Sequence, residues 1–394
     1  MRRQNRKHPQ SFTHRPTKDT TLSYHLLYEE VNNGAYTHRR AALFDDGGRL
    51  LTLRFDDPSR PLTQGTVVWG KVDKVAGGLG AAFVDIGDTL PGVLGLHTLP
   101  HGVKLTEGSK ILCRVTRGGF SEKGARLDAR VAPKPPAAST LAPTIIKPAP
   151  PALVRALHDA GQHPVTVWIP DVRLHDVVKA HVPERLIRTL DEPDAPELFE
   201  TLDEALDTIV SRKPTFTFKG GNIIAEMTSA VATIDVNSPL SSPAGMARND
   251  AILNANLNAA EEIVRVCRLM DLGGSVIVDF ITPGSKAHRD LITEHLRASF
   301  ATADETDVEI RPMSRHGLVE LNRVRTGPSL PLLLAEPPFE AARILLELVR
   351  TAPGGLSMRH EETLRVSSSV ASVLKPLLSD AFCVGILGRR VKLS

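Results

Sequence analysis

The sequence has few cysteines, and they lie far apart. Only Cys113, Cys267 and Cys383 occur in 394 residues, and there is no C-x-x-C pair. Structural zinc sites are usually built from closely spaced cysteines and histidines, so the sequence predicts no zinc. An odd, sparse cysteine count also argues against a disulfide framework. It favours a reducing compartment, and we therefore expect a cytoplasmic location.

Long apolar runs are also missing. No run reaches the about 20 residues that cross a bilayer, so we expect no membrane span. The first 18 residues carry basic side chains and no acid, and they lack the apolar stretch of a secretory signal. We interpret residues 1–36 as a basic disordered arm. It can be attracted to phosphates, or it can be a solvated tail without a specific role.

The remaining composition is that of an ordinary globular protein. Hydrophobic residues make up 41% of the chain and the net charge is +3. The length predicts two to four domains. In residues 37–56, two apolar runs flank Asp46, Gly47 and Gly48, which predicts a β-hairpin.

Residues 63–132 have a different character from the rest. Five short strand candidates are separated by glycine-rich turns, which predicts an OB-type barrel. Exposed aromatics of such barrels stack on bases, and basic residues follow the nucleic-acid backbone. Phe83 is one candidate for stacking, although packing in the barrel core is an equal alternative from the pattern alone. The proline-rich residues 133–151 predict a stiff linker or an extended strip on the surface.

Two aspartates stand out in the second half of the chain. Asp235 and Asp279 each lie in an apolar strand candidate, and an amphipathic helix over residues 254–274 separates the strands. Aspartates that look buried in this way must be paired, hydrogen-bonded or bound to a metal. One helical crossover can bring the two strands together, so the pattern predicts a site for Mg²⁺, with Mn²⁺ as an alternative. Asn237 lies two residues after Asp235 and projects on the same face.

An ordered set of motifs runs through this region. They read IDVN (234–237), NANLNAAEEI (254–263), DLGG (271–274), IVDF (277–280), SRHG (314–317) and GPSL (327–330). Their order and wording resemble the catalytic core of the ribonuclease E/G family. The similarity covers about a hundred residues, and weaker similarity extends to both flanks.

The resemblance implies an α+β fold: an RNase H-like core, an inserted OB-fold barrel of the ribosomal S-one type, and a small C-terminal α/β appendix. It implies a Mg²⁺-dependent endoribonuclease that cuts single-stranded RNA and leaves 5′-phosphate and 3′-hydroxyl ends. A homo-oligomer is compatible with it. We divide the chain after the arm into a first hairpin of the core (37–62), the barrel (63–132), the linker (133–151), a small α/β insert (152–200), the catalytic core (201–330) and the appendix (338–394).

The resemblance also assigns roles to residues. Asp235 and Asp279 correspond to the metal ligands, and Asn237 corresponds to the residue that orients the first aspartate. Phe83 and Lys123 correspond to RNA contacts of the barrel. Two further residues, Arg315 and Arg323, are candidates for holding phosphates.

Several departures from the family pattern keep a rival interpretation open. The segment after the barrel has no RTAG motif, so the 5′-end sensor is largely missing. Val93 replaces a second stacking phenylalanine, Asn258 lies where the family often has glutamate, and Pro239 lies beside the site. The C-P-x-C zinc link that often follows the GPSL motif is also missing, so zinc-linked assembly is not expected. The rival is a non-catalytic RNA-binding protein that keeps the fold. A scaffold that acts through its basic arm is a third and weaker alternative. The presence of both aspartates argues against both rivals, because neither rival needs a metal site.

Overall fold

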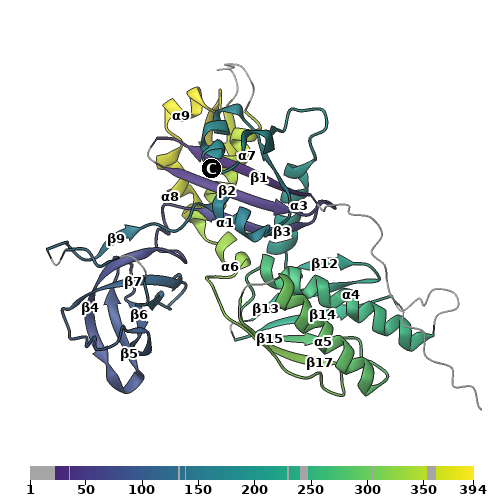
Figure 1. Ribbon diagram of the computed structural model, residues 1–394. Helices are drawn as coiled ribbons and strands as arrows, with labels where there is room; N and C mark the ends of the chain where they lie inside the picture. Colours follow the sequence, from purple (N-terminus) through teal and green to yellow (C-terminus); the bar gives the residue numbers. More distant parts are fainter. Residues whose placement is uncertain are drawn as a thin grey trace, which may run out of the picture.

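The computed structural model describes residues 23–34, 36–131, 134–137, 139–228, 230–239, 247–303, 306–352 and 361–394. Figure 1 shows a barrel and a helix-covered sheet, joined by a central body that holds a second sheet. The predicted arm lies mostly outside the described residues. From Tyr24 the arm prediction is wrong, because Tyr24–Asn32 forms a strand. Within the described ranges, no helix is long and apolar enough to cross a bilayer.

The sheet of the central body has five strands in the order β11-β10-β1-β2-β3. β1 pairs in parallel with β10 and antiparallel with β2. The segment 152–200 therefore shares this sheet with the first hairpin instead of forming a separate insert. The elements of the body are β1 (Tyr24–Asn32), β2 (Thr37–Phe44), β3 (Leu50–Asp56), α1 (Ala152–Asp159), β10 (Val165–Ile169), α2 (His175–Lys179), β11 (Ile187–Thr189) and α3 (Leu198–Val210).

The predicted hairpin between β2 and β3 is confirmed. Asp45 holds the turn, because its Oδ1 accepts hydrogen bonds from the backbone N–H groups of Gly47 (3.0 Å) and Arg49 (2.8 Å). Gly48 adopts a φ of 77°, a left-handed conformation that favours glycine.

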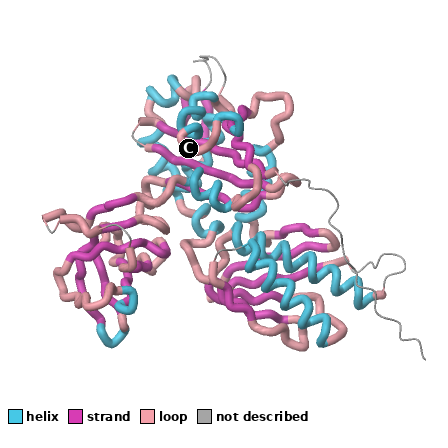
Figure 2. The backbone as a smooth tube through the Cα atoms, viewed as in Figure 1, coloured by secondary structure: helices cyan, strands magenta, loops and turns pink. Residues whose placement is uncertain are grey.

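A closed five-stranded barrel follows, consistent with an OB-like fold, and the five predicted strands are confirmed. Figure 2 shows it almost entirely as strand and loop. The linker adds a sixth strand, β9, along the edge of β4, so its extended-strip interpretation is confirmed there. The strands are β4 (Val67–Ala76), β5 (Ala81–Asp85), β6 (Gly92–Gly95), β7 (Lys110–Arg117), β8 (Arg126–Asp128) and β9 (Thr144–Lys147).

The second large sheet has six strands in the order β12-β13-β14-β15-β17-β16. Only β14 and β15 pair in parallel, and helix α4 makes the crossover between them. The elements are β12 (Thr215–Phe218), β13 (Gly221–Met227), β14 (Ala232–Asn237), α4 (Arg248–Leu269), β15 (Gly274–Asp279), α5 (Lys286–Ala303), β16 (Val308–Ile310) and β17 (Leu318–Arg323).

Helices α4 and α5 lie across one face of this sheet (Figure 1). The strand residues on that face are buried in the main hydrophobic core, for example Ile234, Val276 and Val278. Residues at the alternate positions of the strands are exposed or half-buried. The opposite face of the sheet is therefore open.

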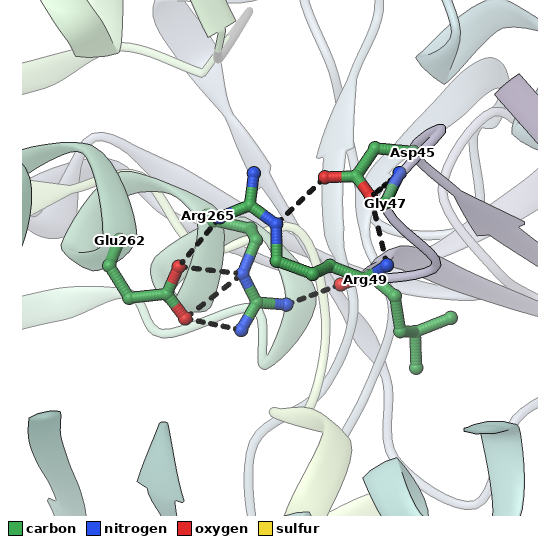
Figure 3. A network of polar contacts seen from close by, with 6 residues as sticks. Asp45, Gly47, Arg49, Glu262 and Arg265 are labelled. Carbon is green, nitrogen blue, oxygen red and sulfur yellow. Dashed lines mark hydrogen bonds and ion pairs between the residues drawn. The ribbon is translucent and has the colours of Figure 1, made fainter. Parts of the chain in front are cut away.

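A polar network joins the central body to this sheet (Figure 3). Arg49 of the hairpin pairs with Asp45 and reaches Glu262 of α4, whose side chain also pairs with Arg265. Arg265 in turn donates to the backbone carbonyl of Leu50. The first hairpin thus packs on α4 but does not belong to the sheet that carries Asp235 and Asp279. The prediction that residues 37–62 form a hairpin of the catalytic core is therefore wrong, because that hairpin lies in a different sheet.

The predicted C-terminal appendix packs on the central body. Its core contains Val31 of β1 together with residues of the last helices, such as Leu345, Leu374 and Phe382. Helix α9 was not predicted from the sequence. The elements are α6 (Leu330–Leu334), which precedes the appendix, then α7 (Pro337–Arg350), β18 (Glu361–Leu364), α8 (Ser368–Leu377), α9 (Asp380–Gly385) and β19 (Arg390–Leu393).

Candidate functional site

Asp235 and Asp279 are neighbours on adjacent strands. They end matching stretches of β14 and β15 and are directly paired in the parallel register. Neighbouring strands lie about 4.8 Å apart, so the two carboxylates project side by side. The crossover predicted from the sequence is what brings them together.

The expectation that these aspartates are buried is wrong. Both lie on the open face of the sheet and are exposed, whereas Ile234, Val236 and Val278 point into the core. The apolar strands suggested cover on both faces, but α4 and α5 cover only one. The carboxylates are consequently accessible to a large substrate.

Asn237 lies on the same face as Asp235. Its Nδ2 donates a hydrogen bond to Asp235 Oδ2 at 3.0 Å. This bond fixes one carboxylate oxygen, and the other has no hydrogen bond from a described residue and can accept a ligand. Asn237 therefore lies where it can orient Asp235, the role that the resemblance implies for it.

The two carboxylates act on each other. Partial loss of hydration, and then the negative charge of Asp235, raise the pKa of the Asp279 carboxyl above its ordinary value. Like charges held this close favour a proton or a cation between them. The pair has therefore the electrostatics of a cation site.

The donor set suits a cation that keeps most of its water. Among the described residues, no group of three or more His, Cys, Asp or Glu side chains converges to hold a metal. Mg²⁺ is usually held by one or two carboxylates together with several waters. Glu226 of β13 is the nearby candidate for a third carboxylate. It is exposed, and its cross-strand partner is Thr233, which lies two residues from Asp235. The Asp235–Asp279 pair therefore fits Mg²⁺ better than a metal that needs a closed cage.

The turn 314–317 lies beside the aspartate pair. Gly317 accepts a hydrogen bond from Phe280 N–H (3.1 Å), and Leu318 is the cross-strand partner of Asp279. Gly317 has a φ of 92°, and a Cβ there would approach the Phe280 carbonyl oxygen to 2.6 Å, so only glycine fits. Arg315 is exposed on this turn, with its Nε 3.0 Å from His316 Nε2. Its guanidinium is free of carboxylate partners among the described residues and can meet a phosphate near Asp279.

The structure contradicts the prediction for Arg323. This side chain is 4% exposed, and its Nη1 donates to Asp271 Oδ1 at 2.7 Å and to the Leu272 carbonyl at 3.1 Å. Val319, Leu321 and Arg323 alternate along β17, so Arg323 projects into the core. It joins β17 to the end of α4 and cannot hold an RNA phosphate.

In the barrel, Phe83 and Lys123 both face outward. Ala82 and Val84 fill the barrel core, whereas Phe83 between them is half-buried on the outer surface. The alternative that Phe83 is barrel core is therefore wrong. Lys123 is exposed, and its Nζ lies 5.7 Å from the ring centroid of Phe120.

The sequence did not single out three further basic residues near Phe120. Arg117, Arg126 and Arg325 gather there from the barrel and from the segment after β17. The available signal was the short spacing of Arg117, Phe120 and Lys123 in RGGFSEK. Arg325 is about 200 residues away in the chain, and only the fold brings it to the same place.

Comparison with known proteins agrees with the family resemblance that the motifs indicate. Residues 137–326 match the model of the Ribonuclease E/G family. The chain is 27% identical over 384 residues to Ribonuclease E of Haemophilus influenzae, covering 74% of this chain and 41% of that protein. It is 34% identical over 142 residues to a chloroplastic Ribonuclease E/G-like protein of Arabidopsis thaliana, covering 36% and 14%. It is 39% identical over 111 residues to Ribonuclease E of Escherichia coli, covering 28% and 10%. The chain spans less than half the length of these curated relatives.

Proposed function

We propose that this chain, whose residues 137–326 belong to the ribonuclease E/G family, is an endoribonuclease that cuts single-stranded RNA with a divalent cation. The observation that carries the proposal is the in-register pair of Asp235 and Asp279 on an open sheet face, with Asn237 bonded to the first. A protein that only binds RNA has no need of paired carboxylates, which repel phosphates unless a cation lies between them.

Each part of the site has a distinct task in this proposal. Asp235 and Asp279 hold Mg²⁺, and Asn237 keeps the Asp235 carboxylate oriented. A cation bound there would polarise the scissile phosphate and lower the pKa of a nearby water. Arg315 lies beside Asp279 and holds a neighbouring phosphate by charge-assisted hydrogen bonds.

The products follow from attack by water. The water oxygen bonds to phosphorus, and the bond from phosphorus to the 3′ oxygen breaks. The proton passes to the leaving oxygen, which gives a 3′-hydroxyl on one fragment and a 5′-phosphate on the other.

The barrel captures the substrate in this proposal. Phe83 presents its ring on the outer surface, where a base can stack on it, and Lys123 follows the backbone. Both contacts are independent of base identity, as expected of an enzyme that acts on single strands. The RNase H-like character of the catalytic core is part of the proposal, and what supports it is the order of its elements along the chain. A homo-oligomer stays a prediction that light scattering tests.

Cleavage of a fluorescent single-stranded RNA with and without Mg²⁺ tests the proposal. Asp235→Asn and Asp279→Asn should abolish cleavage, because each removes charge from the cation, while RNA affinity is kept by the barrel. Glu309→Gln is the matched control, since Glu309 is an exposed carboxylate on the edge strand of the same sheet. Cleavage near wild type in either aspartate variant would overturn the metal assignment. RNA binding without any cleavage by wild type would favour the rival RNA-binding protein.

A further inference from the structure

Three cations surround one aromatic ring where the barrel meets the body. Phe120 is 8% exposed, and the cationic ends of Arg117, Lys123 and Arg325 lie 5.0, 5.7 and 5.9 Å from its ring centroid. Arg126 is the cross-strand partner of Arg117. We call Arg117, Arg126 and Arg325 the arginine cluster. It brings together charges that repel each other unless an anion lies among them.

The arginine cluster has no carboxylate partner among the described residues. Arg117 donates instead to the Gly124 carbonyl, and Arg325 to the Gly273 carbonyl, both at 2.6 Å. The Nε of Arg117 is buried and has no hydrogen-bond partner in the part of the chain that the structure describes. Burial, and then the positive charges of Arg126 and Arg325, lower the pKa of the Arg117 guanidinium. The cluster therefore has unused donors and uncompensated charge.

The surrounding acids do not neutralise it. A cavity of about 640 Å³ lies beside Phe120 and Lys123, and its walls also carry acidic residues. Most of these acids already have a side-chain partner: Asp57 is hydrogen-bonded with His38, Asp271 is paired with Arg323 and Glu336 with Arg60. Asp88 is the acid on this wall that has no cation partner in the described chain; its carboxylate accepts from Thr89.

The arginine cluster continues a row of side chains across the barrel. Phe83 pairs with Val93, Val93 with Arg126 and Arg126 with Arg117, on strands β5, β6, β8 and β7 in turn. Phe83, Val93 and Arg126 pair without a shift, so they project to the same side of the sheet, and two strand spacings amount to about 10 Å. Arg117 adjoins Arg126 at an irregularity of the β7–β8 ladder. A single strand stacked on Phe83 can thus reach the cluster along one surface.

Arg325 connects this row to the six-stranded sheet. It packs on the glycine turn that begins β15, where a Cβ on Gly273 would meet Arg325 Cγ at 2.5 Å. From Gly274, β15 runs about 16 Å to Asp279. The arginine cluster is therefore placed between the two parts of the molecule that the proposed function uses.

We propose that the arginine cluster binds the phosphodiester backbone of single-stranded RNA and carries the strand from the barrel toward the six-stranded sheet. Guanidinium groups suit this task because they hold phosphate oxygens by paired, charge-assisted hydrogen bonds. The contact reads no bases, so it serves RNA of any sequence. The inference rests on the proposed function, since it names a second anchor for the same substrate.

Salt-dependent binding of a labelled single-stranded RNA tests the arginine cluster. Arg126→Gln and Arg325→Gln each remove one phosphate contact, which lowers the salt slope of the logarithm of affinity by about 0.7 for a single strand. Affinity should then fall about eightfold at 0.05 M monovalent salt and converge with wild type near 1 M. Arg325→Lys should restore most of the slope. Arg126 is the cleaner probe, because its side chain makes no described hydrogen bond whose loss can disturb folding.

Arg130→Gln is the matched control. Arg130 is an exposed arginine on the same barrel whose charge is already paired with Asp128. It should leave the salt slope close to that of wild type. If the cluster variants match this control while wild type binds RNA, the arginine cluster is refuted and the proposed function stands. Failure of wild type to bind RNA at low salt would instead overturn the proposed function, and this anchor with it.

Discussion

Two arginines that look alike in the sequence should behave in opposite ways when each is replaced by methionine. Arg323 is buried between β17 and the end of α4, whereas Arg315 is exposed on the turn beside Asp279. Arg323→Met removes the ion pair with Asp271 and the donor to the Leu272 carbonyl. Methionine fills most of the same space with an apolar chain, so the cavity contribution is small.

The expected loss can be worked from these contacts. Removing one partner of a buried ion pair costs about 3–5 kcal/mol. Asp271 keeps a hydrogen bond from Thr326 Oγ1 at 2.6 Å, and its side chain is 18% exposed, so part of the penalty is relieved. We expect Arg323→Met to lower the free energy of unfolding of this sheet by about 2–4 kcal/mol. Arg315→Met should change it by less than about 0.5 kcal/mol, as is usual at exposed positions.

Hydrogen exchange of the amides in β15 and β17 is the suitable assay. It reports the opening free energy of this sheet even where other parts of the chain unfold separately. RNA affinity of the folded variants completes the comparison, because Arg315→Met should weaken binding and Arg323→Met should not. A loss below about 1 kcal/mol in Arg323→Met would refute the reasoning. So would a selective loss of RNA affinity in that variant.

Three further outcomes follow from the geometry. Phe83→Ala should weaken RNA binding by about 1–3 kcal/mol, the worth of one stacked base, and titration by fluorescence anisotropy checks this. Asn237→Ala should slow cleavage about 10–100-fold, with higher Mg²⁺ recovering part of the rate, because the residue only orients Asp235. Burial opposes the charge of Asp57, but hydrogen bonds with His38 and Ser59 outweigh it and lower the pKa of this carboxyl. Its contribution to stability is therefore present above the unfolded pKa of about 4 and is lost as the pH falls through the lower folded value, so denaturation of Asp57→Asn should depend less on pH in that acid range.

Local sequence patterns predicted much of the fold because they report local structure. Three predicted features depend on segments that lie close together in the chain. They are the turn at residues 45–48, the five barrel strands and the single-helix crossover that pairs Asp235 with Asp279. The pairing of β1 with β10 joins segments about 140 residues apart, and no local pattern encodes it.

The candidate site was harder to predict because exposure depends on packing between elements. Apolar flanks made Asp235 and Asp279 look buried, and the sequence does not say that helices cover only one face. The burial of Arg323 did have a signal. Val319, Leu321 and Arg323 alternate with polar residues along β17, so Arg323 shares the apolar face. The phosphate contact was predicted from the charge of Arg323, without regard to this alternation along β17.

The packing of the last helices on β1 sets an order for folding during synthesis. Val31 shares a core with Leu345, so the ribosome must add about 310 residues between them. At about 5–20 residues per second this takes roughly 15–60 s. The barrel, by contrast, draws all its strands from residues 67–147 and can close as soon as they emerge. A nascent chain can therefore present a finished barrel long before the appendix completes the core around Val31. In that interval β1 is held by its partner strands β2 and β10, both of which are synthesised well before the appendix.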